Sequence, residues 1–153
     1  MNSNILAPAL QIRFSNCDSD LEAVVALMRE LNYPTTINVM RERIEASESN
    51  PKLCTMVAEL DGKVIGMVAL NQVKSFARNE TATQVSALIV AKEHRGQGIG
   101  KRLIRSAEEW GKKQGSQTLF LVSGNRVERA PAHAFYEHIG FEKIGYQFVR
   151  KLN

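Results

Sequence analysis

The stretch Arg95-Gly96-Gln97-Gly98-Ile99-Gly100-Lys101 decides the fold of this chain, because it joins a β-rich run to a helical one. Apolar residues predict a strand over 83–90 before it, and helical spacing of apolar residues predicts a helix over 99–110 after it. Glycines allow positive φ and let successive N–H groups converge on an anion. A helix N-terminus adds unsatisfied N–H groups and a favourable dipole. The turn is therefore expected to hold phosphate.

The glycines by themselves are also compatible with a plain strand-to-helix turn. The flanking charges favour a ligand instead. Arg95 precedes the glycines, and Lys101 and Arg102 follow them. Cations at a helix N-terminus oppose the macrodipole unless an anion is bound there. This local conflict indicates that the turn binds an anionic group.

Two familiar phosphate-binding motifs do not fit the spacing. In a Walker loop, Arg95 would have to be glycine and Arg102 would have to be Ser or Thr. In a dinucleotide fingerprint starting at Gly96, Lys101 would have to be glycine. The Walker loop is therefore excluded, and the dinucleotide fingerprint fits poorly.

The rest of the chain predicts strands that first precede and then alternate with helices, which indicates an α/β or α+β fold with a mixed sheet covered by helices on both faces. The predicted tight turn is Asp61-Gly62, a pair that suits type I′. The expected elements are strands over 10–14, 53–60, 64–70 and 118–122; a helix over 21–31, with a capping box at Ser19 and Glu22; a weaker helix over 37–44; a helix over 128–138; and two closing strands within 141–152, with a bend at Gly145.

Composition predicts a single domain over residues 1–153. The chain is 44% hydrophobic and 24% charged, as in an ordinary globular domain. Its start lacks the features of a signal peptide, and no run approaches the length of a membrane span. The separated Cys17 and Cys54 are expected to be reduced thiols. These features predict a cytoplasmic protein with no membrane partner.

Nucleic-acid and metal binding are not expected. The net charge of +4 favours an anionic partner, but the basic residues do not interleave with aromatic ones as in a nucleic-acid surface. The histidines and cysteines show no metal-ligand spacing.

Two segments in the same order resemble the GCN5-related N-acetyltransferases. The first is the Arg-Gly-x-Gly-x-Gly turn at Arg95 after Leu88-Ile89-Val90. The second runs from Ala132 to the Gly140-Phe141 pair, and Asn125 lies between the two. The match covers about residues 83–141. The resemblance implies a single-domain acyl-CoA N-acyltransferase fold, with a mostly antiparallel sheet, a splayed central strand pair, about four flanking helices, and acetyl-CoA as acyl donor.

The resemblance also implies roles for individual residues. The backbones of Leu88, Ile89 and Val90 should contact the pantetheine arm, and Asn125 should contact the cofactor. The residues that should surround the pyrophosphate are Arg95, Gly96, Gln97, Gly98, Ile99, Gly100 and Lys101.

The same resemblance makes Tyr136 the general acid that protonates the departing thiolate. A tyrosine hydroxyl has a reference pKa of about 10 and a thiol one of about 8.5. An N–H at Ile89 or Val90 is the expected oxyanion donor. The base stays open. Some members have a glutamate where Gln84 stands, and an amide is no base; Glu80, His133 and ordered water remain alternatives.

The acceptor is expected to be a primary amine of a small molecule or a peptide. In this family, segments corresponding to residues 30–43 and 124–131 bind it, and neither carries an acidic cluster typical of a polycation site. A non-catalytic acyl-CoA sensor is the alternative function, and a homodimer is compatible with the resemblance.

Overall fold

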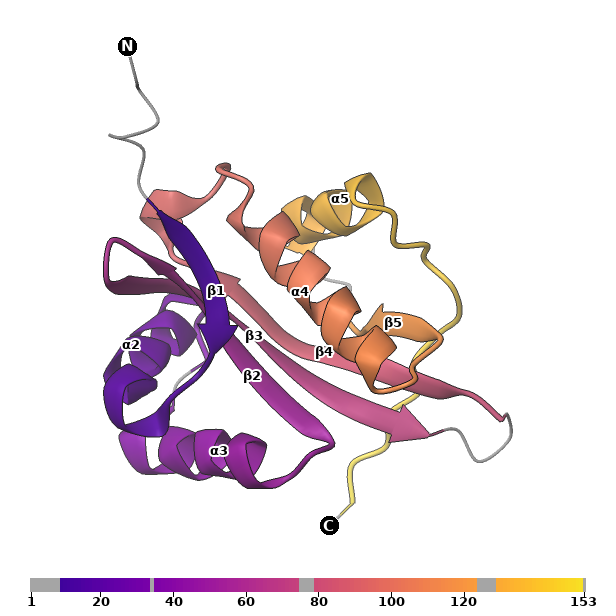
Figure 1. The fold of residues 1–153 in the computed structure, drawn as a ribbon. Coiled ribbons are helices and arrows are strands. Elements are labelled where there is room, and N and C mark those ends of the chain that lie inside the picture. The colour runs from indigo at the N-terminus through magenta and orange to yellow at the C-terminus, as the bar shows by residue number, and fades with distance from the viewer. Residues whose placement is uncertain (1–8, 34, 75–78, 124–128, 153) are drawn as a thin grey trace. The chain divides into compact units, whose positions relative to one another are not determined.

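A five-stranded mixed sheet with the order β1-β2-β3-β4-β5 forms the core of the first of two units of the chain, Met1–Leu121 and Val122–Asn153. The computed structural model describes residues 9–33, 35–74, 79–123 and 129–152. Strands β1 to β4 pair antiparallel, and β5 lies parallel to β4 across the α4 crossover (Figure 1). The elements are β1 (Leu10–Phe14), α2 (Cys17–Glu30), α3 (Ile37–Ser49), β2 (Leu53–Leu60), β3 (Lys63–Lys74), β4 (Thr81–Val90), the 3-10 helix η1 (Lys92–His94), α4 (Ile99–Lys113), β5 (Thr118–Leu121) and α5 (Ala130–His138).

The hairpin between β2 and β3 has the predicted turn. Asp61 and Gly62 have φ of 50° and 79°, and Leu60 pairs with Lys63. Positive φ at both central residues is the signature of type I′. The hairpin is confirmed, although β3 runs to Lys74 rather than ending at Leu70.

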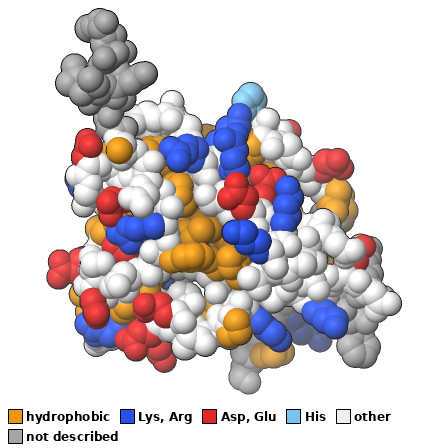
Figure 2. Space-filling model, in the orientation of Figure 1, with side chains coloured by type: hydrophobic (Ala, Val, Ile, Leu, Met, Phe, Trp, Pro, Cys, Tyr) orange, Lys and Arg blue, Asp and Glu red, His pale blue; other side chains and the backbone are white. Residues whose placement is uncertain are grey.

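Helices cover both faces of the sheet, as neighbouring residues of β3 show. Ile65 adjoins Ala26 and Leu27 of α2. A Cβ on Gly66 would lie 3.2 Å from Leu103 Cδ1 of α4. Because successive residues of a strand face opposite sides, α2 and α4 cover opposite faces. Hydrophobic surface remains open on the α4 face, between β1 and α4 (Figure 2).

Helix α4 packs closely on β4 where Gly111 meets Thr83. A Cβ on Gly111 would lie 2.9 Å from Thr83 Oγ1, which is hydrogen-bonded to Ser116 Oγ at 2.7 Å. Thr83 is fully buried. This contact lets α4 lie close to β4, the strand that precedes the glycine turn.

The start of α2 corrects one prediction. The capping box at Ser19 and Glu22 is wrong, because the N-cap is Asn16, whose Oδ1 accepts from the N–H groups of Asp18 and Ser19. The helix therefore begins at Cys17, one turn earlier than expected. An asparagine N-cap satisfies the orphan N–H groups of the first turn as well as Ser would.

An ion-pair cluster joins β1, α2 and β2. Arg13 donates to both carboxylate oxygens of Asp20, at 2.8 and 2.9 Å, and to Glu59 Oε1 at 2.9 Å. Asp20 is 1% exposed. The hydrogen bonds from Arg13 lower the pKa of Asp20 against the opposing effect of burial.

The second unit, as far as it is described, contains α5 followed by residues without regular secondary structure. The two closing strands predicted within residues 141–152 are wrong, although Gly145 has the φ of 75° that a bend favours. Ile144, Tyr146 and Phe148 are 84%, 91% and 92% exposed. Alternating apolar residues form a strand only with a hydrogen-bonding partner, and the described part of this unit provides no other strand.

Candidate acyl-CoA and acetyl-transfer site

The predicted glycine turn lies between β4 and α4. After Val90, the chain makes the short helix η1, turns at Arg95 to Gly98, and enters α4 at Ile99. Gly96 and Gly98 have φ of 78° and 81°. This left-handed backbone costs an L-residue with a Cβ about 1–2 kcal/mol, so glycine is what the turn requires.

The backbone N–H groups of this turn have no partner among the described residues. Within the described part of the chain, no acceptor takes the N–H groups of residues 96–101, and the helical ladder begins with Arg102 N–H donating to Gly98 O at 3.1 Å. Gly98, the N-cap, has no side chain to satisfy them. N–H groups of this kind at the positive end of a 15-residue helix can bind an anion.

The cationic side chains around the turn differ in their contacts. Arg95 Nε donates to Val90 O at 3.2 Å, so this guanidinium braces the turn against the end of β4. Lys101 is exposed, and so is Arg102, whose Nη1 lies 3.5 Å from Leu10 O. The sequence suggested Arg95 as a source of charge, and the structure adds a contact that shapes the loop.

Strand β4 is longer than its partner β5. Pairing with β5 covers only Ala82 to Val85, whereas pairing with β3 continues to Val90. In the described residues, the stretch 86–90 therefore has a strand on one side only. An open strand edge of this kind can pair with an extended ligand.

The alternation of the backbone decides which residues face the open edge. Ala91 N–H donates to Ile65 O of β3 at 2.8 Å. The backbone N–H and C=O groups of Ala91 and of Ile89, two residues earlier, therefore face β3. The backbone groups of Leu88 and Val90 face away from β3, consistent with the hydrogen bond from Arg95 Nε to Val90 O. Of the two candidate oxyanion donors, the Val90 N–H faces the open edge, whereas the Ile89 N–H faces β3.

Some of the residues suggested for the acceptor amine and the base lie in the first unit. Gln84 is a half-buried β4 residue paired with Asn71 and Phe120. Glu80 lies just before β4. Tyr33, between α2 and α3, is 56% exposed. Glu30, the last residue of α2, accepts from Lys92 N–H at 2.9 Å and so ties the expected acceptor segment to the residues before the glycine turn.

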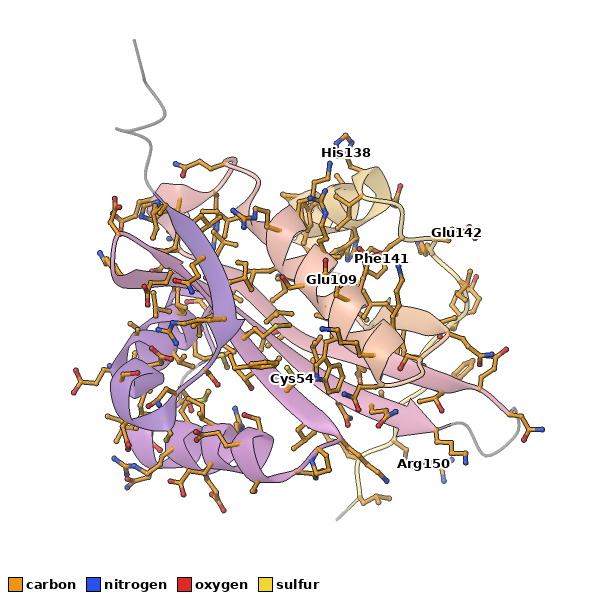
Figure 3. All side chains as sticks on the ribbon, viewed as in Figure 1. Cys54, Glu109, His138, Phe141, Glu142 and Arg150 are labelled. Carbon is orange, nitrogen blue, oxygen red and sulfur yellow. The ribbon has the colours of Figure 1, made fainter. Side chains whose placement is uncertain are left out.

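Helix α5 of the second unit carries Tyr136. Its ring makes edge contacts with Phe135 and Phe141, at centroid distances of 5.6 and 5.9 Å. One turn earlier, His133 Nε2 lies 3.0 Å from Ser123 Oγ. Figure 3 shows His138 at the end of this helix, directed outward. The predicted helix over 128–138 is confirmed from Ala130 onward.

Sequence reasoning did not include Ser123, and it included Glu30 only as the first residue of the expected acceptor segment. Ser123 lies ten residues before His133, a spacing that no helix or strand period connects. Asn125, the remaining cofactor candidate, lies outside the described residues, as does most of the segment 124–131.

The described residues contain neither a metal-binding cluster nor a membrane-spanning helix. There, no group of three or more His, Cys, Asp or Glu side chains could hold a metal ion. No helix in this part of the chain is long and apolar enough to cross a membrane.

Solved structures define the class of this fold. An aminoglycoside N-acetyltransferase in complex with CoA superposes with a TM-score of 0.85 at 20% identity, covering 95% of this chain and 96% of that one. At this identity the likeness concerns the fold alone. The fold is therefore that of the acyl-CoA N-acyltransferases, as the sequence predicted.

Sequence comparison then gives the family. A model of the acetyltransferase (GNAT) family matches residues 21–141, so the chain belongs to that family. N-acetyltransferase family 8 member 2 of Rattus norvegicus is 39% identical over 93 residues, which are 61% of this chain and only 40% of that protein. Aminoalkylphosphonate N-acetyltransferase of Salmonella typhimurium is 26% identical over 95% of this chain and 93% of that protein.

Proposed function

We propose that this protein transfers the acetyl group of acetyl-CoA to a primary amine of a small molecule or peptide, by direct attack within a ternary complex. The observation that carries the proposal is the row of N–H groups at residues 96–101, which have no acceptor among the described residues and directly follow the open edge of β4. An extended thioester with a pyrophosphate at one end matches this arrangement. Membership of the acetyltransferase family supports the same donor.

The donor would be bound mainly through backbone groups. The pyrophosphate binds the N–H groups of the glycine turn, helped by Lys101, and Arg95 keeps the turn against β4. The pantetheine amides pair with the backbone of Leu88, Val90 directs its N–H toward the acetyl end of the donor, and Ile89 supports the strand from the core. Asn125 completes the cofactor contacts.

The chemistry requires an oxyanion donor and an acid. We assign the donor to Val90 N–H, because it faces the open edge of β4, and the acid to Tyr136. In this mechanism the amine nitrogen attacks the thioester carbon, the C–S bond breaks, and the sulfur takes the proton of the tyrosine hydroxyl.

The two units would work as a single N-acetyltransferase domain over residues 1–153, which the family match from 21 to 141 supports because it spans both. We place this domain in the cytoplasm, as a monomer or homodimer. The free thiols of Cys17 and Cys54 support a reducing compartment.

The test is free-thiol release from acetyl-CoA across a panel of primary amines. Aminoalkylphosphonates and aminoglycosides belong in the panel, because the names of the Salmonella relative and of the superposed structure contain these amines. Amine-dependent release that falls about 100-fold or more in Tyr136→Phe supports the transferase and its acid, since general acid catalysis contributes at least this much.

An acyl-CoA sensor is the second candidate, and Gln84 is the observation that favours it. An amide stands where some family members have a carboxylate, so a carboxylate base is missing at this position. Tight CoA binding without turnover on any amine of the panel would replace the transferase with the sensor.

A further inference from the structure

We propose that His133, acting through the hydroxyl of Ser123, is the general base that takes the proton of the acceptor amine. The assignment rests on the proposed function. It starts from one contact, His133 Nε2 to Ser123 Oγ at 3.0 Å, between α5 and the residues that follow β5. Both side chains are half-buried.

The position of His133 relative to the acid supports this role. His133 precedes Tyr136 by three residues within α5, so the two side chains share a helix face about 5–6 Å apart at Cβ. In the tetrahedral intermediate, the amine nitrogen and the sulfur are bonded to the same carbon. A base for the nitrogen must therefore lie within a few ångströms of the acid for the sulfur.

The other titratable residues of α5 do not share this placement. Glu137 and His138 follow Tyr136 by one and two residues, and both are exposed. Residues so spaced do not face each other on a helix. His133 is thus the titratable residue of α5 on the face of the acid, and imidazole is the side chain whose ordinary titration lies nearest neutrality.

The serine hydroxyl can relay a proton because it both donates and accepts. The ammonium gives one proton to Ser123 Oγ as Oγ passes its own to His133 Nε2, which leaves a neutral amine and an imidazolium. The amine then attacks, the C–S bond breaks, and sulfur takes the Tyr136 proton. The surplus proton on the amide nitrogen restores the Tyr136 hydroxyl, and the imidazolium releases its proton to solvent.

The test uses acceptors that differ only in the pKa of the amine. For an amine that turns over, each added fluorine near the nitrogen lowers the pKa, until the amine is neutral at the assay pH and needs no base. We expect His133→Gln and Ser123→Ala to lower kcat/KM about 100-fold for the parent amine. The defect should shrink to within about threefold for the most fluorinated analogue, since the base then contributes little.

His138→Gln is the matched control, because it removes the exposed imidazole of the same helix and should leave every rate unchanged. Imidazole in the buffer should partly restore His133→Ala. CoA affinity, measured by calorimetry, should be unchanged in all variants.

A defect of the same size for every amine would assign His133 a structural role and overturn the proposal. So would full activity of His133→Gln on the parent amine. Absence of wild-type turnover on every amine would instead refute the proposed function and this assignment with it.

Discussion

Replacing Gly98 with alanine perturbs the anion site while leaving the core untouched. Gly98 has φ of 81°, and a Cβ built there meets no atom within 4 Å, so the folded state suffers only from the strained backbone. That strain amounts to about 1–2 kcal/mol. In a domain of this size, the melting temperature should fall by about 2–4 °C for each kcal/mol.

The effect on donor binding should be larger than the effect on stability. Relief of the backbone strain at residue 98 turns the neighbouring peptide groups, so the N–H groups next to it change direction. Each charge-assisted hydrogen bond that is lost costs about 1.5–3 kcal/mol. The Kd for CoA should therefore rise by roughly 10- to 150-fold for each lost bond.

Gly115→Ala is the matched control. Gly115 has φ of 86°, also has no atom within 4 Å of a built Cβ, and lies beyond the C-terminal end of α4. It should lower the melting temperature as much as Gly98→Ala and leave the Kd for CoA unchanged. Calorimetric titration with CoA and thermal denaturation measure the two effects. Wild-type affinity in Gly98→Ala, or an equal loss in Gly115→Ala, would refute the anion-site reasoning.

Three further predictions concern the packing of the fold. Asp20→Asn should destabilise the fold by roughly 1.5–3 kcal/mol at pH 7 through the lost hydrogen bonds to Arg13. Because the folded pKa of Asp20 is lowered, this difference should be full above the unfolded value of about 3.9 and shrink as pH falls below it, in urea titrations at several pH values; a constant difference would contradict the ion pair. Gly111→Ala should cost about 1 kcal/mol net, because overpacking against Thr83 outweighs the helix propensity of alanine, and no cost should remain in Thr83→Ala; a stabilised single variant would disprove this contact. Burial raises the pKa of Cys54 to about 12, so its thiol should resist iodoacetamide at pH 8 until urea unfolds the chain, as peptide mass analysis would reveal; rapid alkylation of the folded protein would contradict its burial (Figure 3).

The glycine turn was predictable because its causes are local. The signals lie next to one another in the sequence: an apolar strand, then glycines that allow positive φ, then the apolar face of a helix. Ile99, Leu103 and Ala107 are buried as expected. The helix continues past Gly111 to Lys113, because the close contact of Gly111 with Thr83 favours glycine there, and the break comes at Gly115.

Features that depend on distant partners were predicted less well. Which of Ile89 and Val90 faces the open edge follows from the register against β3, which the sequence does not specify. The contact of Ser123 with His133 joins residues ten apart, and it depends on how the chain folds within the second unit. Strands were predicted within residues 141–152 from alternation alone, and alternation does not supply a pairing partner.

Acetyl-CoA labelled with carbon-13 in the acetyl group gives a direct test of acetyl transfer to an amine. The protein is incubated with the labelled donor and the amine panel, and the fate of the label is followed by mass spectrometry and NMR. We predict that the label appears in an amide bond to one of the amines, in step with free-thiol release. Label recovered only as free acetate, or retained in acetyl-CoA that binds the protein without reaction, would contradict it.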